Sequence, residues 1–327
     1  MVAPRTVVVV NPKSQGGKLG ARWHEVSETL SRAFPFDEAM TTGPGDATRL
    51  TREALRAGAE RIIAIGGDGT INEVVNGFFE NGLAIAPEAS FGVIPFGTGG
   101  DFRKTLKMPT EITDAAAVIA SNQRTKIDVG KLEFTTMAGT PATRMFVNIA
   151  SFGVSGVVDR LVNESGKKLG RLSFMYATAR ATWSYKNQRV QLVLDGKDRV
   201  EATINTVAVA NGRFFGGGMM VAPNAEIDDG QFDVIAIGDL GFRELITSGQ
   251  RLFKGTHLTM DKVTARRAKV VEAEAIDPGA VVELDVDGEN PGKLPARFEI
   301  VPAALWTVVP AGRPPTAPTN TTTPTTH

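Results

Sequence analysis

Twelve consecutive residues, from Ile62 to Glu73, read IIAIGGDGTINE and place one acid, Asp68, inside a glycine-rich loop. The apolar run before the loop predicts a buried strand, and Thr70 with Glu73 matches the capping box, which satisfies free backbone N–H groups at a helix start. Backbone N–H groups and the helix dipole favour anions at such a position, so the loop predicts phosphate binding. A carboxylate there would repel phosphate, and Asp68 therefore needs a different role.

Two more polar or glycine-rich loops follow strand-like segments. Residues Asn11 to Lys18 follow the first strand, and residues Phe96 to Asp101 follow the strand expected at Phe91–Pro95, with Thr98 and Asp101 at the spacing of a helix cap. One such loop alone is more often only a turn, but three of them after parallel strands would meet at one edge of a sheet, which suits a polyphosphate or a nucleotide. Neither GxxxxGKS/T nor GxGxxG after the first strand occurs, so the site must bind phosphate by another design.

The segment from Arg5 to about Ser121 alternates between strand and helix patterns, which is typical of a doubly wound parallel sheet in an α/β domain. The expected strands are Thr6–Val10, Phe36–Met40, Arg61–Ile65 and Phe91–Pro95. The expected helices are Gly20–Phe34, Asp46–Gly58, Thr70–Phe79 and Thr113–Ser121, with Asp46 as the N-cap of the second. Ligands of such sheets bind beyond the carboxyl ends of the strands.

After about Lys126 the pattern changes to consecutive strands, which predicts a C-terminal antiparallel, β-sandwich-like domain. The expected strands are Lys126–Phe134, Arg144–Ala150, Val190–Leu194, Ala202–Ala210, Phe232–Ile237, Lys269–Ala275, Ala280–Val286 and Arg297–Val301. Two helical stretches, near Val157–Tyr185 and Phe242–Phe253, interrupt them. We therefore expect an α/β domain over residues 1–125, a β-rich domain over residues 126–310, and a disordered Pro/Thr-rich tail over residues 311–327.

Composition excludes several kinds of chemistry. The 327 residues include no cysteine, which rules out disulfides, thiolate zinc sites and cysteine nucleophiles, and the three histidines stand in no recognisable motif. The formal net charge of +0 gives no whole-chain attraction to nucleic acid, so we expect no nucleic-acid partner. No apolar run is long enough to span a membrane, and the start MVAPRTVVVVN does not read as a secretory signal, so we expect a cytoplasmic protein.

The motifs of this chain resemble those of the bacterial diacylglycerol and lipid kinases, which are related to sphingosine and ceramide kinases and more distantly to NAD kinases. The resemblance spans most of the chain. It is carried by Asn11-Pro12-Lys13-Ser14, Thr41 with Gly45-Asp46-Ala47, Gly66 to Thr70 with Ile71 to Gly77, Gly97 to Phe102, Gly216 to Met219, Ala222-Pro223, Asp228-Asp229-Gly230 with Asp233, and Asp287-Gly288-Glu289.

This resemblance implies an ATP- and Mg²⁺-dependent lipid kinase with particular site residues. ATP would be bound by Asn11, Pro12, Lys13, Ser14, Gln15, Thr41, Gly66, Gly67, Asp68, Gly69, Thr70, Ile71, Asn72 and Thr98. A Mg²⁺ site separate from the catalytic ions is implied at Asp229, with the backbone carbonyls of Glu226 and Gln231. Glu289 corresponds to the catalytic base.

With phosphate held by loop N–H groups, Asp68 is expected to interact with the Mg²⁺ ion of the nucleotide, directly or through water. Asp287 would either hold metal or orient Glu289, although Asp287-Gly288-Glu289 without the family match reads as a hairpin turn. The chain departs from the family at Gly100, where Asn is usual, and at Gln231, where Leu is usual. The first change removes a side-chain amide from the nucleotide site.

The expected function is transfer of phosphate from ATP to diacylglycerol or a related lipid alcohol. A kinase of a soluble substrate such as NAD, or an inactive nucleotide- or lipid-sensing protein, are the alternatives. The segments Phe214–Met220 and Val157–Tyr185 are candidates to line a lipid cleft and to touch the inner face of the membrane transiently, although ordinary core packing explains most of their residues individually. The family also suggests a homodimer.

Overall fold

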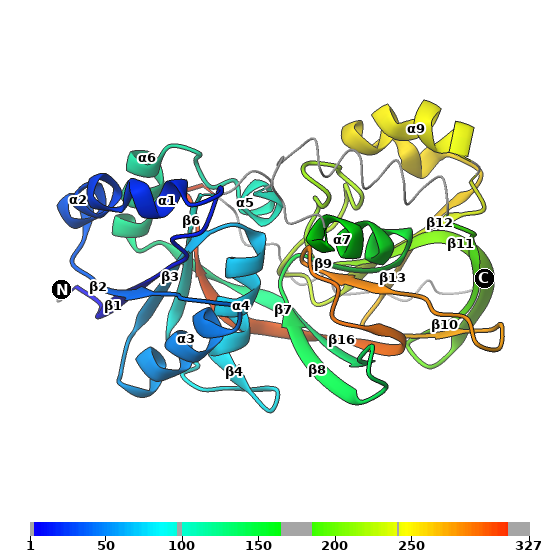
Figure 1. Cartoon of the computed structure of the whole chain (residues 1–327), viewed down its shortest axis with the longest axis horizontal. Helices are drawn as coiled ribbons and strands as arrows, with labels where there is room; N and C mark the ends of the chain where they lie inside the picture. Colours follow the sequence, from blue (N-terminus) through cyan, green and yellow to red (C-terminus); the bar gives the residue numbers. More distant parts are fainter. Residues whose placement is uncertain (1–2, 97–99, 165–184, 241, 313–327) are drawn as a thin grey trace, which may run out of the picture.

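The computed structural model describes residues 3–96, 100–164, 185–240 and 242–312 of the chain. Thr98, most of the helical stretch expected at Val157–Tyr185 and the tail from residue 313 onward lie outside the described residues. Figure 1 shows an N-terminal half, in blue and cyan, beside a C-terminal half, in green to orange. The predicted fold class, a parallel-sheet α/β half followed by antiparallel strands, is confirmed.

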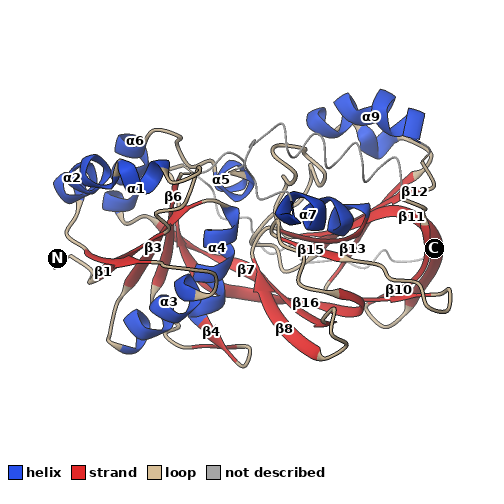
Figure 2. Cartoon of the chain, in the orientation of Figure 1, coloured by secondary structure: helices blue, strands red, loops and turns tan. Residues whose placement is uncertain are grey.

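The N-terminal half is built on four parallel strands in the order β2, β1, β3, β6. These strands are Thr6–Val10 (β1), Asp37–Met40 (β2), Arg61–Gly66 (β3) and Ser90–Pro95 (β6), and the short pair Phe79–Glu80 (β4) and Leu83–Ala84 (β5) forms a separate hairpin. The helices are Lys18–Ala21 (α1), Trp23–Ala33 (α2), Asp46–Arg56 (α3), Asp68–Phe78 (α4), Asp101–Leu106 (α5) and Ile112–Ser121 (α6). Figure 2 shows helices α2 and α6 on one side of the sheet and α3 and α4 on the other.

The central strands of this sheet are apolar and covered on both faces. All five residues of β1 and all six of β3 are buried. Continuous burial is expected for parallel strands between two helical layers, and each fully buried Val or Ile side chain contributes ~1.5–3 kcal/mol of transfer free energy. The rigid strands fix where the three loops at their carboxyl ends begin.

The capping box predicted for α4 is wrong. The helix begins at Asp68, two residues before Thr70, and its N-cap is Gly67; no side chain among the described residues caps it. Instead, the Glu73 carboxylate accepts hydrogen bonds from the backbone N–H groups of Gly45, at 3.0 Å, and Ala47, at 3.1 Å. Glu73 therefore satisfies the start of the neighbouring helix α3, a contact that a local sequence pattern could not indicate.

The N-cap prediction for Asp46 is wrong by one residue. Gly45 is the N-cap of α3, and its φ of 83° lies in the left-handed region that favours glycine. Asp46 is the first helical residue, and its carboxylate accepts hydrogen bonds from the backbone N–H of Thr42, at 2.8 Å, and from the Thr42 hydroxyl, at 2.5 Å. The side chain thus closes the loop that leads into the helix.

The C-terminal half consists mainly of antiparallel strands. They are Arg124–Thr135 (β7), Pro141–Phe146 (β8), Ile149–Gly153 (β9), Gln188–Leu194 (β10), Asp198–Ala210 (β11), Phe232–Gly238 (β12), Val263–Ala268 (β13), Val270–Ala275 (β14), Leu284–Val286 (β15) and Lys293–Val308 (β16). The described helical elements are Val154–Glu164 (α7), Phe242–Lys254 (α9) and the 3₁₀ turn His257–Thr259 (η1). The sequence did not predict β13, and the strand expected at Arg144–Ala150 is two strands, β8 and β9.

The last strand, β16, joins the two halves. It pairs antiparallel with β7 and β14, and its end pairs parallel with β6, with Trp306 opposite Ser90 and Thr307 opposite Phe91. As a result, one sheet of fourteen described strands runs through both halves. The division near residue 125 stays a prediction about folding units, because Leu305 and Val308 pack in the core of the N-terminal half.

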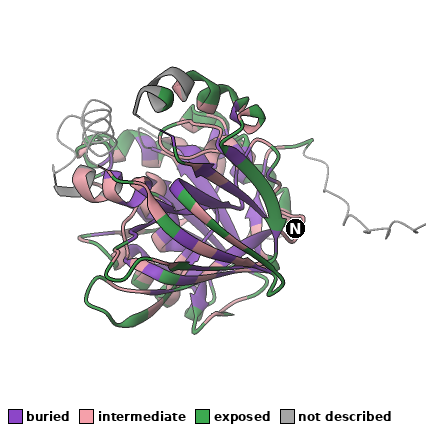
Figure 3. Cartoon of the chain, turned by 90° about the vertical axis from the view of Figure 1, so that its right-hand side faces the viewer, coloured by how far each residue is buried: buried purple, intermediate pink, exposed green. Residues whose placement is uncertain are grey.

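Three groups of buried apolar residues form the core, the largest of them around β1, β3 and β6. Figure 3 shows the strands as the buried interior and most of the exposed surface on helices, loops and strand ends. In the part of the chain that the structure describes, no helix has both the length and the apolar character that a membrane crossing requires.

Candidate active site

The loop that follows β1 is hydrogen-bonded to the first turn of α4 and to the end of β3, at the carboxyl edge of the sheet. The Asn11 amide donates to the Thr70 hydroxyl at 3.0 Å, and the backbone N–H of Asn11 donates to the Ile65 carbonyl at 3.2 Å. Lys13 donates its ammonium to the Thr42 carbonyl at 2.9 Å, which brings in the loop after β2, where Thr41 lies buried. The residues expected at the nucleotide, Thr98 apart, are therefore gathered at this edge: Asn11, Pro12, Lys13, Ser14, Gln15, Thr41, Gly66, Gly67, Asp68, Gly69, Thr70, Ile71 and Asn72.

Gly66 is the position where this loop tolerates no side chain. A Cβ atom there would lie 2.6 Å from the Thr70 hydroxyl oxygen, 2.8 Å from the Thr70 Cβ and 3.1 Å from the Ser14 hydroxyl oxygen. At Gly67, by contrast, a Cβ would meet nothing within 4 Å, and φ is −87°. The first glycine is needed for packing of the loop, and the second leaves open space on the side of the helix start.

This difference gives a matched pair of variants. Gly66→Ala is expected to lower the free energy of unfolding by ~1–3 kcal/mol, because the added methyl group forces Thr70 and the strand end apart. Gly67→Ala is expected to change stability by less than ~1 kcal/mol, because the backbone conformation is allowed and the reduced freedom of the unfolded chain offsets the poorer N-cap residue. Urea unfolding without ligands measures both, and equal stability of the two variants would contradict the steric argument.

Asp68, the first residue of α4, uses only one of its two carboxylate oxygens in a hydrogen bond within the described residues. Its Oδ2 accepts a hydrogen bond from the backbone N–H of Asp101 at 3.3 Å, and its enclosed Oδ1 has no hydrogen-bond partner among the described residues. Burial, followed by the charge of Asp101, raises the pKa of Asp68 to about 6. An unpartnered carboxylate oxygen at the edge where phosphate is expected suits a divalent cation, so the residues fit the expected Mg²⁺.

The described side chains offer few ligands to a cation at Asp68. In the described ranges, no group of three or more His, Asp or Glu side chains is placed to hold a metal ion by itself. Mg²⁺ commonly keeps waters and takes one or two carboxylates together with substrate phosphates. A cation at Asp68 would therefore depend on the phosphate oxygens of the nucleotide for most of its ligands.

The Asp287 side chain is buried, and both of its carboxylate oxygens accept hydrogen bonds. Its Oδ2 accepts from the Asn72 amide at 2.9 Å and from the backbone N–H of Val147 at 3.3 Å, and its Oδ1 accepts from the N–H of Ile149 at 3.0 Å. Burial raises its pKa to about 6, and these hydrogen bonds act in the opposite direction. Since both oxygens are used, the contacts favour the alternative in which Asp287 orients the turn that carries Glu289.

Glu289 lies against the first turn of α4, although 220 positions separate it from Gly69 of that turn in the sequence. A Cβ atom on Gly69 would be 3.0 Å from the Glu289 Oε1. The other oxygen, Oε2, accepts a hydrogen bond from the Arg144 guanidinium at 2.5 Å, and Arg144 also donates from Nε to the Asn72 Oδ1 at 2.8 Å. The expected base thus lies beside the glycine-rich start of α4.

Arg144 and Asp101 are site residues that sequence reasoning missed or undervalued. Arg144 stands only at the start of an expected strand, and no motif marks it. Asp101 reads as part of a helix cap, but its Oδ2 accepts from the backbone N–H of Gly217 at 2.8 Å and its Oδ1 pairs with Lys104 at 3.0 Å. Asp101 therefore joins α5 to the glycine-rich loop at residues 216–218, a contact that only the tertiary fold creates.

The residues expected at the separate Mg²⁺ site lie in one loop, but the Asp229 carboxylate, the one side chain expected to bind that ion, is already paired with an arginine. The Asp229 carboxylate contacts the Arg267 guanidinium through Oδ2 and accepts from the backbone N–H of Gln231 through Oδ1, at 3.1 Å. The Glu226 carboxylate contacts Arg213. Burial raises the pKa of Asp229, and Arg267 acts in the opposite direction.

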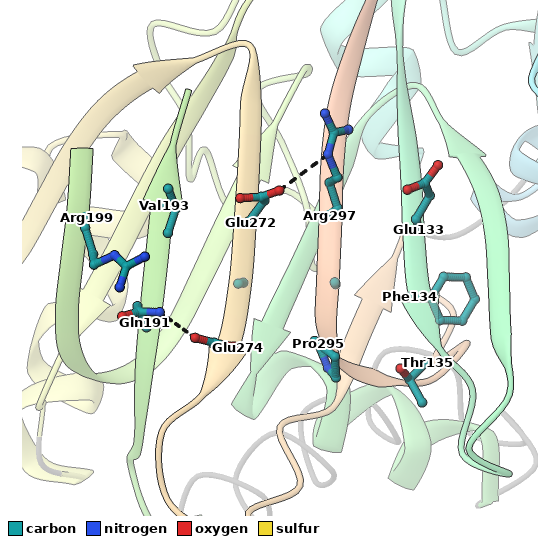
Figure 4. A pocket seen from close by; sticks show the side chains of 12 residues that line it. Glu133, Phe134, Thr135, Gln191, Val193, Arg199, Glu272, Glu274, Pro295 and Arg297 are labelled. Atoms are coloured by element: carbon teal, nitrogen blue, oxygen red, sulfur yellow. Dashed lines mark hydrogen bonds and ion pairs between the residues drawn. The ribbon is translucent and has the colours of Figure 1, made fainter. Parts of the chain in front are cut away.

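A hollow on the outer face of the C-terminal sheet contains none of the candidate site residues. Figure 4 shows its lining side chains on β7, β10, β11, β14 and β16, among them Gln191 close to Glu274 and Arg297 close to Glu272. Two of its charged groups, Arg297 and Glu272, lie 3.6 Å apart as an ion pair. We assign it no part in the site.

Two family models match successive parts of the chain. Residues 5–132 match the model of the "Diacylglycerol kinase catalytic domain", and residues 148–309 match that of the "YegS C-terminal NAD kinase beta sandwich-like domain".

Among curated relatives, "Diacylglycerol kinase" of Staphylococcus carnosus is 30% identical over 300 residues, covering 90% of this chain and 91% of its own. The protein of the same name from Mycobacterium tuberculosis is 27% identical over 308 residues, covering 94% and 95%. A crystal structure of a Bacillus anthracis protein assigned as a diacylglycerol kinase matches with a TM-score of 0.74 and 26% identity, covering 95% of this chain and 99% of that one.

Proposed function

The chain belongs to the diacylglycerol kinase family and is a lipid kinase, and from this premise we propose that it transfers the γ-phosphate of ATP to the hydroxyl of diacylglycerol or a related lipid alcohol. The product would be phosphatidic acid or an analogous phospholipid. The observation that carries the proposal is the position of the Glu289 carboxylate, 3.0 Å from a Cβ placed on Gly69. A proton acceptor there stands at the edge of the sheet where the phosphates would bind.

The first step is phosphate binding by the chain's own loops. Backbone N–H groups of the loop at Gly66–Gly69 and the start of α4 would hold the phosphate oxygens. Lys13 and Asn11 lie beside them and contribute a positive charge and an amide donor. Asp68 and the phosphates would hold Mg²⁺, which when bound spreads the negative charge of the transferring group.

The second step is deprotonation of the acceptor. Glu289 would take the proton of the lipid hydroxyl while the hydroxyl oxygen forms a bond to the γ-phosphorus, and the electrons of the breaking bond leave with ADP. Arg144 would hold the Glu289 carboxylate toward α4 through its 2.5 Å contact, and Asp287 would hold the turn. Positioning of this kind provides most of the catalysis in phosphoryl transfer.

The lipid would approach from the C-terminal half, which we propose as the lipid-substrate domain over residues 126–310. The glycine-rich loop at residues 216–218 is anchored to Asp101 beside the site, and the flanking Phe214 and Met219 are only partly buried. On α9, Phe253 is 51% exposed between the exposed cations Arg251 and Lys254, a combination that supports transient contact with the inner face of a membrane. A homodimer remains a prediction from the family.

A transfer assay tests the proposal. The purified chain is incubated with labelled ATP and Mg²⁺, and diacylglycerol, sphingosine, ceramide and NAD are offered in turn, each lipid in the same detergent micelles. Label is expected in phosphatidic acid or in another of the lipid phosphates.

The acceptor panel separates the other functions. Label in NADP alone would overturn the lipid proposal, since the fold would then serve a soluble acceptor. Transfer to no acceptor, with ATP still bound, would indicate a nucleotide- or lipid-sensing protein. The Glu289→Gln variant under the same conditions is the control for contaminating kinase activity.

A further inference from the structure

The loop that carries Asp229 lies beside two strands whose pairing fixes an arginine next to it. Strands β12 and β13 are antiparallel, and Asp233 on β12 is opposite Arg267 on β13. This register places the Arg267 side chain next to the carboxylates of Asp229 and Asp233. The preceding residue, Arg266, pairs instead with Asp198.

Arg267 bridges two buried carboxylates. Its Nη2 contacts the Asp229 Oδ2, and its Nε lies 3.7 Å from the Asp233 Oδ2, an oxygen with no hydrogen-bond partner among the described residues. The Asp229 and Asp233 side chains are only 10% and 8% exposed. Because a guanidinium is always protonated in proteins, it supplies a permanent positive charge to both acids.

Two other acidic side chains near Asp229 also have partners within the protein. Asp128 accepts from the backbone N–H of Gly230 at 2.6 Å and of Ala303 at 2.7 Å, and Arg213 donates to the Ala225 carbonyl at 2.8 Å while contacting Glu226. A divalent cation on the Asp229 carboxylate would lie within a few ångströms of the Arg267 guanidinium, and two positive charges at that separation repel strongly. Either charge can neutralise the loop, but they exclude each other.

We propose that Arg267 takes the place of a divalent cation at Asp229, so that a side chain of this protein neutralises the loop at residues 226–231. The chain then folds and keeps this loop in place without the separate Mg²⁺ that its motifs imply. The Mg²⁺ required for phosphoryl transfer is a different ion, held with the nucleotide at Asp68.

Thermal unfolding of the nucleotide-free protein, in EDTA and in millimolar MgCl₂, tests this proposal. The wild-type Tm is expected to be the same in both. Arg267→Met is expected to lower the Tm in EDTA by roughly 5 °C, because two buried carboxylates lose their counter-charge. MgCl₂ is expected to restore much of that loss, because the cation can now bind at Asp229.

Two control variants separate this effect from loss of an ordinary ion pair. Arg266→Met removes an arginine of the same strand and should leave the Tm equal in EDTA and in MgCl₂. Arg267→Lys keeps the charge and should also show no response to MgCl₂. A wild-type Tm that rises in MgCl₂, or an Arg267→Met variant as stable as wild type in EDTA, would overturn the proposal.

Calorimetry covers the case in which Arg267→Met does not fold. MgCl₂ titrated into nucleotide-free wild type should give the same heats as MgCl₂ titrated into Asp229→Asn. A binding heat that is present in wild type and absent from Asp229→Asn would overturn the proposal. Neither ATP nor lipid is present in these measurements, so their outcome is independent of the lipid acceptor and of the role of Glu289.

Discussion

Glu289→Gln is expected to lower the rate constant of phosphoryl transfer by about 10²- to 10⁴-fold while leaving ATP affinity near the wild-type value. Gln has nearly the same shape as Glu and can still accept the hydrogen bond from Arg144, but its amide cannot take a proton from the lipid hydroxyl. The loop that would hold the phosphates, at Gly66–Gly69, is unchanged in this variant. Single-turnover transfer from labelled ATP and equilibrium ATP binding measure the two quantities separately.

Glu299→Gln is the matched control for this variant. Glu299 is also held by an arginine at 2.5 Å, in this case Arg297, but it lies on β16 away from the three loops. Its replacement should leave transfer at the wild-type rate, since only an ion pair is lost. Wild-type turnover by Glu289→Gln would rule out Glu289 as the base, and loss of ATP binding would show that the variant had disturbed the nucleotide site.

Asp68→Asn is expected to make the protein more stable at neutral pH and at the same time to lower phosphoryl transfer at least about 10²-fold. The gain in stability comes from removing a charge that is held in a poorly solvated place, and ~1–2 kcal/mol is expected after allowing for partial exposure. The loss of activity has the same origin, because an amide oxygen holds Mg²⁺ far less well than a carboxylate. Urea unfolding and labelled-ATP transfer, both at pH 7.5, measure the two effects.

The pH dependence of stability identifies the Asp68 charge as the cause. The pKa of Asp68 is about 6 in the folded protein and near its ordinary value of 3.9 when unfolded, so the folded state binds more protons between these values. The contribution of the Asp68 carboxyl to the free energy of unfolding is therefore fully present below about pH 4 and is lost as pH rises through about 6. Asp287 acts in the same direction, so Asp68→Asn should reduce this slope without abolishing it.

Asp46→Asn provides a control of opposite sign. Hydrogen bonds from the Thr42 side chain and backbone hold the pKa of Asp46 well below its usual range. Its contribution to stability is present above the unfolded pKa and is lost as pH falls, so Asp46→Asn should be less stable than wild type at neutral pH. If Asp68→Asn were also destabilising at neutral pH, the account of its buried charge would be wrong.

Much of the parallel-sheet half could be predicted because its signals are local. Strand β1 has the predicted bounds, Thr6–Val10, since a run of four valines between polar residues permits little else. The junction between β3 and α4 could be placed within Gly66 to Gly69 for a similar reason, because strand, glycines and helix follow one another directly. The predicted start of α4 is wrong because Glu73 accepts hydrogen bonds from α3 and its N-cap, and a contact between two helices produces no pattern in the sequence of either one.

The missing parts of the site depend on contacts between distant segments. The role of Arg144 follows from the fold, in which β8 ends beside both Asn72 and Glu289. The role of Arg267 follows from the register of β12 with β13. Strand β13 itself, VTARRA, alternates poorly and is exposed at four of its six residues, so the period-2 pattern that predicts strands is absent. The family motif located the Asp229 loop but could not indicate an arginine that comes from another strand.

The pairing of β16 with β6 has a consequence for how the chain folds during synthesis. Until residues 306 and 307 have left the ribosome, one edge of β6 has no strand to cover it, although the other three strands of the α/β half have long been complete. An uncovered edge of this kind can pair with other chains. The nascent protein therefore carries an aggregation-prone edge for most of its synthesis, and a nonsense mutation a few codons before Trp306 would make that edge permanent.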